Sequence, residues 1–145
     1  MRKSSRGIIV YDNNILVIHR NKFGDEYYML PGGALELGES PEECLRREIM
    51  EETSIAVSDL KLVFTEDDKF YGRQYVYLVK YLSGRPELSV ESTEYKINLL
   101  GKNIYTPMWL SLTDFASVKF ITPKLQQSIL QLIAENFQFS DVRAI

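Results

Sequence analysis

Residues 40–55 read S-P-E-E-C-L-R-R-E-I-M-E-E-T-S-I, and this stretch constrains the fold more than any other part of the chain. Ser40 is a suitable N-cap, Pro41 suits the first helical position, and Glu43 completes a capping box with Ser40. We therefore expect a helix that begins after Ser40 and ends near Thr53. A helix with such a definite start fixes which side chains share each of its faces.

The last two turns of this helix carry three carboxylates on one side. At about 100° per residue, Glu48, Glu51 and Glu52 fall within an arc of about 100°. Leu45 and Ile49 lie on the flank of this arc, where they can fasten the helix to a core. Like charges three or four positions apart destabilise a helix by about 0.2–0.5 kcal/mol per pair, and a divalent cation reverses that balance. Oxygen ligands suit Mg²⁺ or Mn²⁺, although such a run taken alone is far more often a solvated, charge-rich helix.

The negative charge of the chain is concentrated in the same region. Between Glu36 and Glu52 there are seven glutamates and two arginines, a net charge of −5 within a chain total of −3, so the remaining residues carry +2. A nucleic-acid-binding surface usually has a basic patch, and the sequence contains no dense Lys/Arg cluster. A local acidic cluster points instead to a bound cation.

Length and composition bound the other possibilities. With 145 residues and 45% hydrophobic content, the chain has the size of one domain with one core, and we expect a single domain over residues 1–145. Cys44 is the only cysteine, which excludes an intrachain disulfide and disfavours a cysteine-based zinc site. The sequence has no evident signal peptide or membrane-spanning apolar run, so we expect a cytoplasmic protein. No protein partner is implied, and a homodimer stays open.

Apolar runs between turn signals predict strands and helices around one core, an α/β or α+β domain. Residues 7–11 and 15–20 are expected to form a hairpin around the turn D-N-N. A strand over 105–110 contains Pro107, which favours an edge position or a bulge. Residues 87–103 are expected to form an irregular surface loop. Further strands are expected at 27–30, 57–65 and 74–81, and a final helix from Thr122-Pro123.

The segment L-P-G-G-A-L-E-L-G-E-S (30–40) precedes the acidic helix and supplies glycines that let the backbone approach a ligand closely. Loop and helix together fit the spacing G-x₅-E-x₇-R-E-U-x-E-E, where U is aliphatic. This pattern resembles the signature of the Nudix (MutT-like) hydrolase family, with the box at residues 33–55. Ser54 is its one departure, because the family has Gly there, the residue favoured just past a helix end. The matching residues are Gly33, Glu39, Arg47, Glu48, Glu51 and Glu52.

The resemblance implies a Nudix-like α/β/α sandwich with a mixed central β-sheet. It also implies an Mg²⁺-dependent hydrolase, with Mn²⁺ as a possible substitute, that cleaves a phosphoanhydride bond in a nucleoside diphosphate linked to another moiety. Such small nucleotide substrates include NTPs, ADP-ribose, nucleotide sugars and dinucleoside polyphosphates. In the family pattern Glu48 and Glu52 are the principal metal ligands and Glu51 is the next. The carbonyl of Gly33 is a further candidate ligand.

The resemblance leaves the general base open between two positions. Glu48 itself is the base in some relatives, while in others the base or an extra metal ligand is a glutamate on a loop before a later strand. Glu94 is the candidate for that glutamate, and Glu91 is second. Arg47 would hold Glu48 in place, and Glu39 is expected to support the loop and the helix rather than contact metal.

Three residues outside the box are candidates for substrate binding. Arg20 ends a strand that points toward the box and is a candidate phosphate ligand, with an ordinary surface arginine as the alternative. Tyr28 and Tyr71 are candidates for base stacking, with core or strand packing as the alternative. His19 is assigned no role, and Cys44 is expected to be a packed thiol.

Two other classes of function remain open. One is a Nudix-like domain that binds or senses a nucleotide without cleaving it, and the other is a cation-stabilised interaction domain. Degenerate relatives of the first kind usually lose box glutamates or the arginine, whereas all of them are present here. This difference favours the enzyme.

Overall fold

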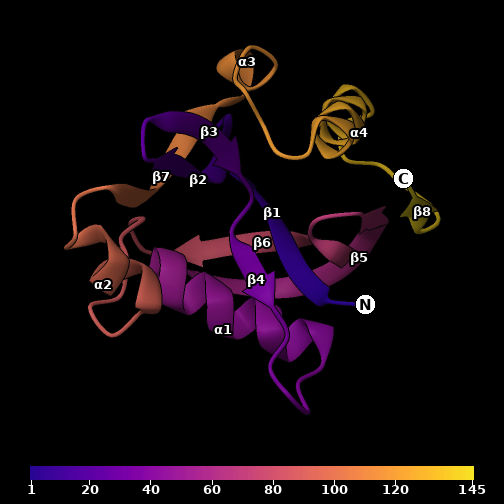
Figure 1. Cartoon of the computed structure of the whole chain (residues 1–145). Helices are drawn as coiled ribbons and strands as arrows, with labels where there is room; N and C mark the ends of the chain where they lie inside the picture. The colour runs from indigo at the N-terminus through magenta and orange to yellow at the C-terminus, as the bar shows by residue number, and fades with distance from the viewer.

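The computed structural model describes residues 1–145 and contains one mixed sheet of eight strands with helices on both of its faces (Figure 1). The predicted fold class, including the mixed central sheet, is therefore confirmed. The elements in chain order are β1 (Lys3–Tyr11), β2 (Asn14–Lys22), β3 (Asp25–Met29), β4 (Gly32–Ala34), α1 (Pro41–Thr53), β5 (Ala56–Asp68), β6 (Gly72–Ser83), α2 (Thr93–Asn98), β7 (Asn103–Ser111), α3 (Leu112–Phe115), α4 (Pro123–Ala134) and β8 (Arg143–Ala144).

The main path of the sheet runs β3-β2-β1-β6-β5-β8, while β4 pairs with β1 and β7 pairs with β2. β1 and β6 are parallel, and most other pairs are antiparallel. The predicted hairpin is present, and its turn residues Asp12 and Asn13 both have positive φ, at 48° and 62°. Such a two-residue turn matches the twist of the flanking strands. Pro107 lies in β7, which pairs with β2 alone, so its edge position is confirmed.

Two apolar clusters hold the helices to the sheet. On one face, Leu45 and Ile49 of α1 are fully buried, and a Cβ added at Gly7 would lie 3.4 Å from the Ile49 side chain. Gly7 thus lets the acidic helix lie directly on β1. On the other face, α4 buries Leu125, Ile129 and Leu132 in the larger cluster, so the final helix belongs to the core.

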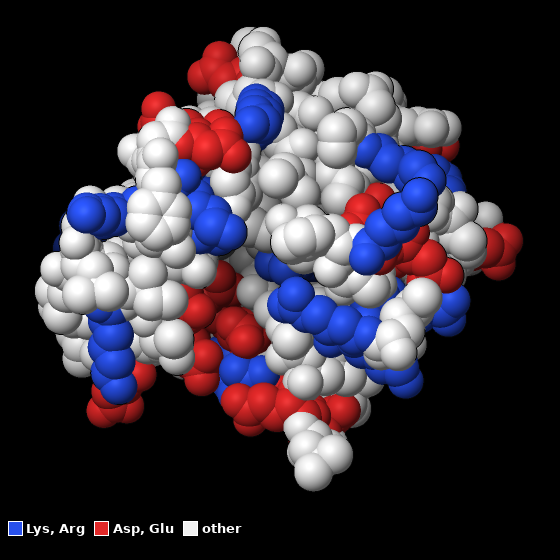
Figure 2. Space-filling view, viewed as in Figure 1, with Lys and Arg blue, Asp and Glu red and all other residues white.

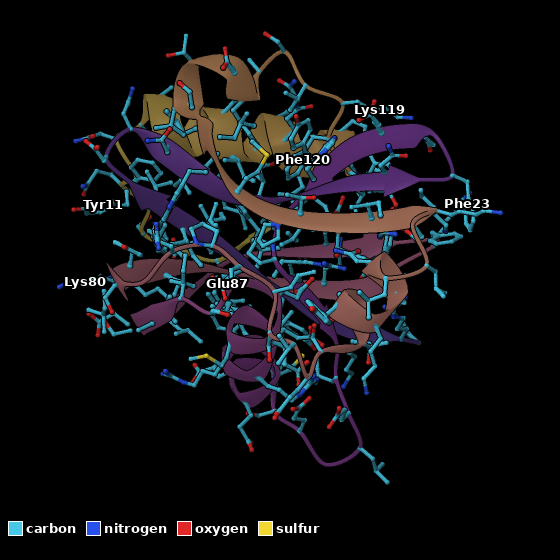
Figure 3. The ribbon with its side chains drawn as sticks, turned by 90° about the vertical axis from the view of Figure 1, so that its left-hand side faces the viewer. Tyr11, Phe23, Lys80, Glu87, Lys119 and Phe120 are labelled. Atoms are coloured by element: carbon cyan, nitrogen blue, oxygen red, sulfur yellow. The ribbon has the colours of Figure 1, made fainter.

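Aromatic side chains at two positions illustrate the inside and outside of this arrangement (Figure 3). Phe120 lies between α4 and the strands and is 2% exposed. Phe23 projects outward from the turn between β2 and β3 and is 71% exposed. None of the helices has both the length and the apolar content needed to cross a membrane.

Three features of the local structure differ from the prediction. The expected irregular loop at 87–103 contains the helix α2. Ser92 caps this helix by accepting a hydrogen bond from the Tyr95 N–H at 3.1 Å. The polar composition of the segment gave no sign of a helix. The strand expected at 27–30 ends at Met29, and the chain resumes as β4 beside β1. The short elements α3 and β8 have no periodic pattern and were not expected.

Candidate active site

Helix α1 positions the acidic cluster, and its start is built as predicted. The Glu43 N–H donates to Ser40 Oγ at 3.2 Å, and the Ser40 N–H donates to Glu43 Oε1 at 3.3 Å. Pro41 occupies the first turn, and the helix ends at Thr53. The fixed start and the buried Leu45 and Ile49 determine which way the later glutamates face.

Arg47 binds the carboxylates on the outer side of α1. Its Nε donates to Glu39 Oε2 at 2.7 Å and its Nη2 donates to Glu39 Oε1 at 3.0 Å, a bidentate pair. Its Nη1 donates to Glu48 at 3.0 Å and to Glu51 at 3.3 Å. The hydrogen bonds from Arg47 lower the pKa of Glu39 to about 2. Glu39 also accepts the Glu36 N–H. It therefore links the loop to α1, as expected.

Glu48, Glu51 and Glu94 come together although they lie on two different helices. One carboxylate oxygen of each lies within 4.8 Å of the others, and all three side chains are partly buried. Glu94 reaches this place because it lies in the first turn of α2. Burial raises the pKa of Glu48, and the neighbouring Glu94 and Glu51 raise it further, against the opposing effect of Arg47. The group has the ligand chemistry and spacing of a divalent-cation site.

Glu52 lies deeper, beside Glu48, and is 5% exposed. Its Oε1 accepts the Gly32 N–H at 2.8 Å, and its second oxygen makes no hydrogen bond within the protein. Burial and the charge of Glu48 raise the pKa of Glu52 well above its usual range. A buried carboxylate with a free oxygen and a like-charged neighbour is stabilised by a cation.

Gly33 completes this side of the site. A Cβ at this position would lie 2.6 Å from Glu48 Oε1, so any larger residue would displace the carboxylate. The Gly33 carbonyl accepts a hydrogen bond from the Cys44 thiol at 3.4 Å. Cys44 is fully buried, in agreement with a packed thiol, and burial raises its pKa to about 11.

The acidic residues open into a pocket of about 270 Å³. Figure 2 shows the acidic side chains in a recess, with basic side chains on both sides of it. An adjoining hollow of about 250 Å³ shares Glu48 and Glu94 with this pocket and also contains Glu91. The charged residues that line the main pocket are Glu48, Glu52 and Glu94 together with Arg2, Arg6, Arg20 and Lys22.

The predicted substrate residues have different outcomes. Arg20 lines the pocket and is 8% exposed, with its guanidinium carbon 3.7 Å from the centre of the Tyr105 ring. Tyr71 also lines the pocket. Tyr28 does not, because side chains alternate along β3; Tyr27 lies in the pocket instead. Tyr28 packs on the larger core cluster and against the ring of His19, with ring centres 4.8 Å apart.

Ser54, the departure from the family pattern, has the left-handed conformation that favours glycine, with φ 59° and ψ 16°. Its hydroxyl donates to the carbonyl of Glu87 at 2.7 Å. The backbone N–H groups of Glu87 and Ser89 donate to the carbonyls of Thr53 and Glu51, both at 2.9 Å. The end of α1 is therefore bonded to the segment that leads to α2 and Glu94.

Arg6, Tyr27 and Tyr105 line the pocket without having been expected there. The run K-S-S-R before the first apolar strand looks like a polar chain end, whereas β1 begins at Lys3 and buries Ser4, Ser5 and Arg6. The one sequence signal for Arg6 was its position directly before the apolar run of 7–11, where a strand can extend backwards.

The fold agrees with comparisons to known proteins. A sequence model of the family described as NUDIX domain matches residues 1–129, most of the chain. This chain belongs to the NUDIX family. The structure is similar to that of a MutT NUDIX hydrolase from Burkholderia pseudomallei, with a TM-score of 0.67 and 27% identity, over 89% of this chain and 97% of that one.

Two curated NUDIX relatives match a shorter region. The RNA pyrophosphohydrolase of Psychromonas ingrahamii is 36% identical over 59 residues, which are 41% of this chain and 33% of that protein. The ADP-ribose pyrophosphatase of Methanocaldococcus jannaschii is 44% identical over 66 residues, which are 43% of this chain and 39% of that protein. The matched region thus spans between a third and two fifths of each relative.

Proposed function

We propose that this NUDIX protein hydrolyses a phosphoanhydride bond in a nucleoside diphosphate linked to another moiety, with Mg²⁺ as its cofactor. The observation that carries the proposal is the convergence of Glu48, Glu51 and Glu94 beside a pocket whose lining includes Glu48 and Glu94 together with Arg6 and Arg20. Hydrolysis of a phosphoanhydride requires neutralised phosphate charge and a positioned, activated water.

Glu48, Glu51 and the free oxygen of Glu52 would hold the cation, with the Gly33 carbonyl as a further ligand. Bound Mg²⁺ neutralises phosphate charge and lowers the pKa of a coordinated water. Arg47 fixes the carboxylates of Glu48 and Glu51 by hydrogen bonds, so that little reorganisation is needed when the site is loaded. Mn²⁺ has the same preference for oxygen ligands and would substitute.

Glu94 is the proposed general base. It is the one member of the cluster that does not lie on α1, and Arg47 donates no hydrogen bond to it. Its carboxylate is therefore free of the hydrogen bonds by which Arg47 holds Glu48 and Glu51. Glu48, in contrast, has one oxygen engaged by Arg47, which suits a ligand better than a proton acceptor.

The opposite part of the pocket would bind the remainder of the substrate. Arg20 would contact a phosphate, and Tyr71 and Tyr27 would flank the base or ribose. The names of the relatives give activities on RNA and on ADP-ribose. Four basic side chains line the pocket beside the glutamates, which suits a phosphate chain of either kind of substrate.

A substrate panel tests the proposal. It would contain NTPs, oxidised NTPs, 5′-triphosphorylated RNA, ADP-ribose, nucleotide sugars and dinucleoside polyphosphates, each with Mg²⁺ or Mn²⁺. Release of a nucleoside monophosphate or pyrophosphate from at least one class, abolished by EDTA, is the expected result. Tight binding of a nucleotide without turnover by any preparation would replace the enzyme with a nucleotide-sensing domain.

A further inference from the structure

Arg6 is a buried arginine in the middle of the sheet. It lies on β1, opposite Gly32 of β4, and is 6% exposed. Its side chain lines the pocket. Burial of a charged side chain is costly unless the charge is paired and its hydrogen-bonding groups are satisfied, so the contacts of this guanidinium define its role.

Two of the three guanidinium nitrogens are anchored within the protein. Nε donates to Gln74 Oε1 at 3.1 Å, and Nη1 donates to the Leu30 carbonyl at 3.2 Å. Nη2 has no hydrogen-bond partner in the protein, and it is not sealed from the pocket. The guanidinium is thus held by one edge, while the other edge remains available to a ligand.

Arg6 also forms no ion pair with a carboxylate. The charges of Glu52 and Glu48 favour its protonated form, but desolvation is the larger effect and lowers its pKa. Arg47, on the same site, shares its charge among several glutamates. The two arginines therefore differ in the one property that matters for binding an anion, an unpaired positive charge.

A second layer of buried residues orients Gln74. The Gln74 Nε2 donates to Glu66 Oε1 at 2.9 Å, and the Thr122 hydroxyl donates to Glu66 Oε2 at 2.7 Å. All three side chains are at most 7% exposed. The hydrogen bond to Glu66 turns the amide nitrogen of Gln74 toward that carboxylate. The Gln74 carbonyl must then face Arg6.

We propose that Arg6 is a phosphate-binding residue of this site, and that Gln74, Glu66 and Thr122 are positioning residues that hold its guanidinium toward the pocket. The inference rests on the proposed function, because a phosphate chain bound beside the carboxylate cluster supplies the negative charge that Arg6 lacks. A guanidinium with a free edge suits phosphate oxygens. The ligand class is a diphosphate or longer phosphate chain.

The test uses inorganic pyrophosphate with Mg²⁺ as the probe, measured by calorimetry on the full chain at fixed ionic strength. Arg6→Gln should weaken pyrophosphate binding at least about tenfold, the effect of losing a charged hydrogen bond. Arg6→Lys should lose less, because the ammonium keeps the charge but cannot satisfy both anchors and the ligand. Gln74→Met should also weaken binding while leaving the charge of Arg6 in place.

Arg73→Gln is the matched control. Arg73 precedes Gln74 on β6, is exposed, and pairs with Asp67 outside the pocket. Its variant should bind pyrophosphate as the wild-type protein does. The Mg²⁺-induced rise in melting temperature should persist in the folded Arg6 variants, because the carboxylates of the cation site are unchanged.

The outcomes separate this inference from the proposed function. Arg6-dependent pyrophosphate binding without turnover of any substrate in the panel would support the inference and refute the enzyme. Turnover combined with Arg6→Gln binding pyrophosphate within twofold of wild type would overturn the inference alone. If Gln74→Met alone binds normally, Gln74 has no positioning role, and that part of the inference is overturned.

Discussion

The two ends of helix α1 follow opposite rules. At its start, Ser40 and Glu43 form a capping box, and Glu42 and Glu43 lie at the positive end of the helix dipole. At its end, Glu51 and Glu52 lie where the dipole is negative, and no basic residue occupies the last turn. The residue after the helix is a serine with positive φ, where glycine is favoured.

Within thirteen residues, the first turn of α1 is built for helix stability and the last turn is not. Every feature of the first turn stabilises the helix in the absence of any ligand. The features of the last turn raise the free energy of the ligand-free protein, and a bound cation would lower it again. These local violations of folding rules support the proposed site at this end, because natural proteins tolerate such costs mainly at functional sites.

Among substitutions at the two ends of α1, that of Glu52 is expected to have the largest effect on kcat. Glu52→Gln should lower kcat by about 1,000-fold or more, since a metal site supplies several kcal/mol of transition-state stabilisation. The fold should be retained, because the amide keeps an oxygen that can accept the Gly32 N–H. Steady-state kinetics and circular dichroism check both parts, and near wild-type turnover would remove Glu52 from the metal site.

Substitution of Glu94 tests whether the proposed site includes a residue of α2 as well as those of α1. Glu94→Gln should lower kcat by about 100-fold or more, the usual contribution of a general base. It should also remove the acidic limb of the pH–rate profile. An unchanged profile would show that Glu94 is at most a metal ligand, and Glu91→Gln, which alters an exposed neighbour, is the control.

The pH dependence of stability should distinguish the charged end from the capped end. Folding raises the pKa of Glu48 and Glu52, so their contribution is fully present below the ordinary glutamate pKa and is lost as pH rises toward neutrality. In EDTA the melting temperature should therefore fall as the pH rises above the ordinary glutamate pKa, and it should fall less in Glu52→Gln.

Addition of Mg²⁺ at neutral pH should reverse this loss. At a free concentration about 100 times Kd, binding stabilises the folded state by about 2.7 kcal/mol. Thermal melts with and without the metal provide the measurement. A melting temperature that is independent of Mg²⁺ would contradict the cation site.

At the capped end, Ser40→Ala should reduce the free energy of unfolding by about 1 kcal/mol. The reason is that the Glu43 N–H would lose its partner. Denaturant titration measures the loss, and kcat should stay within twofold of wild type. A large kinetic effect would show that the two ends are not separable.

The smallest effect is expected at Ser54. Ser54→Gly relieves about 1 kcal/mol of left-handed strain and loses a hydrogen bond to Glu87 worth about 1 kcal/mol, so its stability should remain close to wild type. Ser54→Ala keeps the strain and loses the bond, and should be about 1 kcal/mol less stable. If Ser54→Gly is strongly stabilised, the bond to Glu87 contributes nothing.

The sequence predicts α1 better than it predicts the rest of the pocket. The bounds of the helix follow from Ser40, Pro41 and a regular apolar face, which are local signals. Tyr27 and Tyr28 are chemically identical neighbours, and which of them faces the pocket depends on the register of β3 with β2. Only the folded chain fixes that register.

Arg6 and Glu94 also show that local sequence signals do not predict long-range contacts. Glu94 was selected by resemblance to the family, although its helix was not expected. Arg6 is buried because β4 and β6 pair with β1 on both sides, and these are long-range contacts. The residues K-S-S-R by themselves do not predict these strand pairings.

The bonds between the end of α1 and residues 87–89 have a consequence for the exchange of segments between relatives. The Thr53 and Glu51 carbonyls and the Ser54 hydroxyl set where the chain begins its path toward α2. A chimera that imports another protein's 87–103 segment would inherit its specificity residues but would need the same three attachments to place its glutamate. Compatibility of a transplanted segment is thus decided at the end of α1, and not only at the glutamate that the segment is meant to deliver.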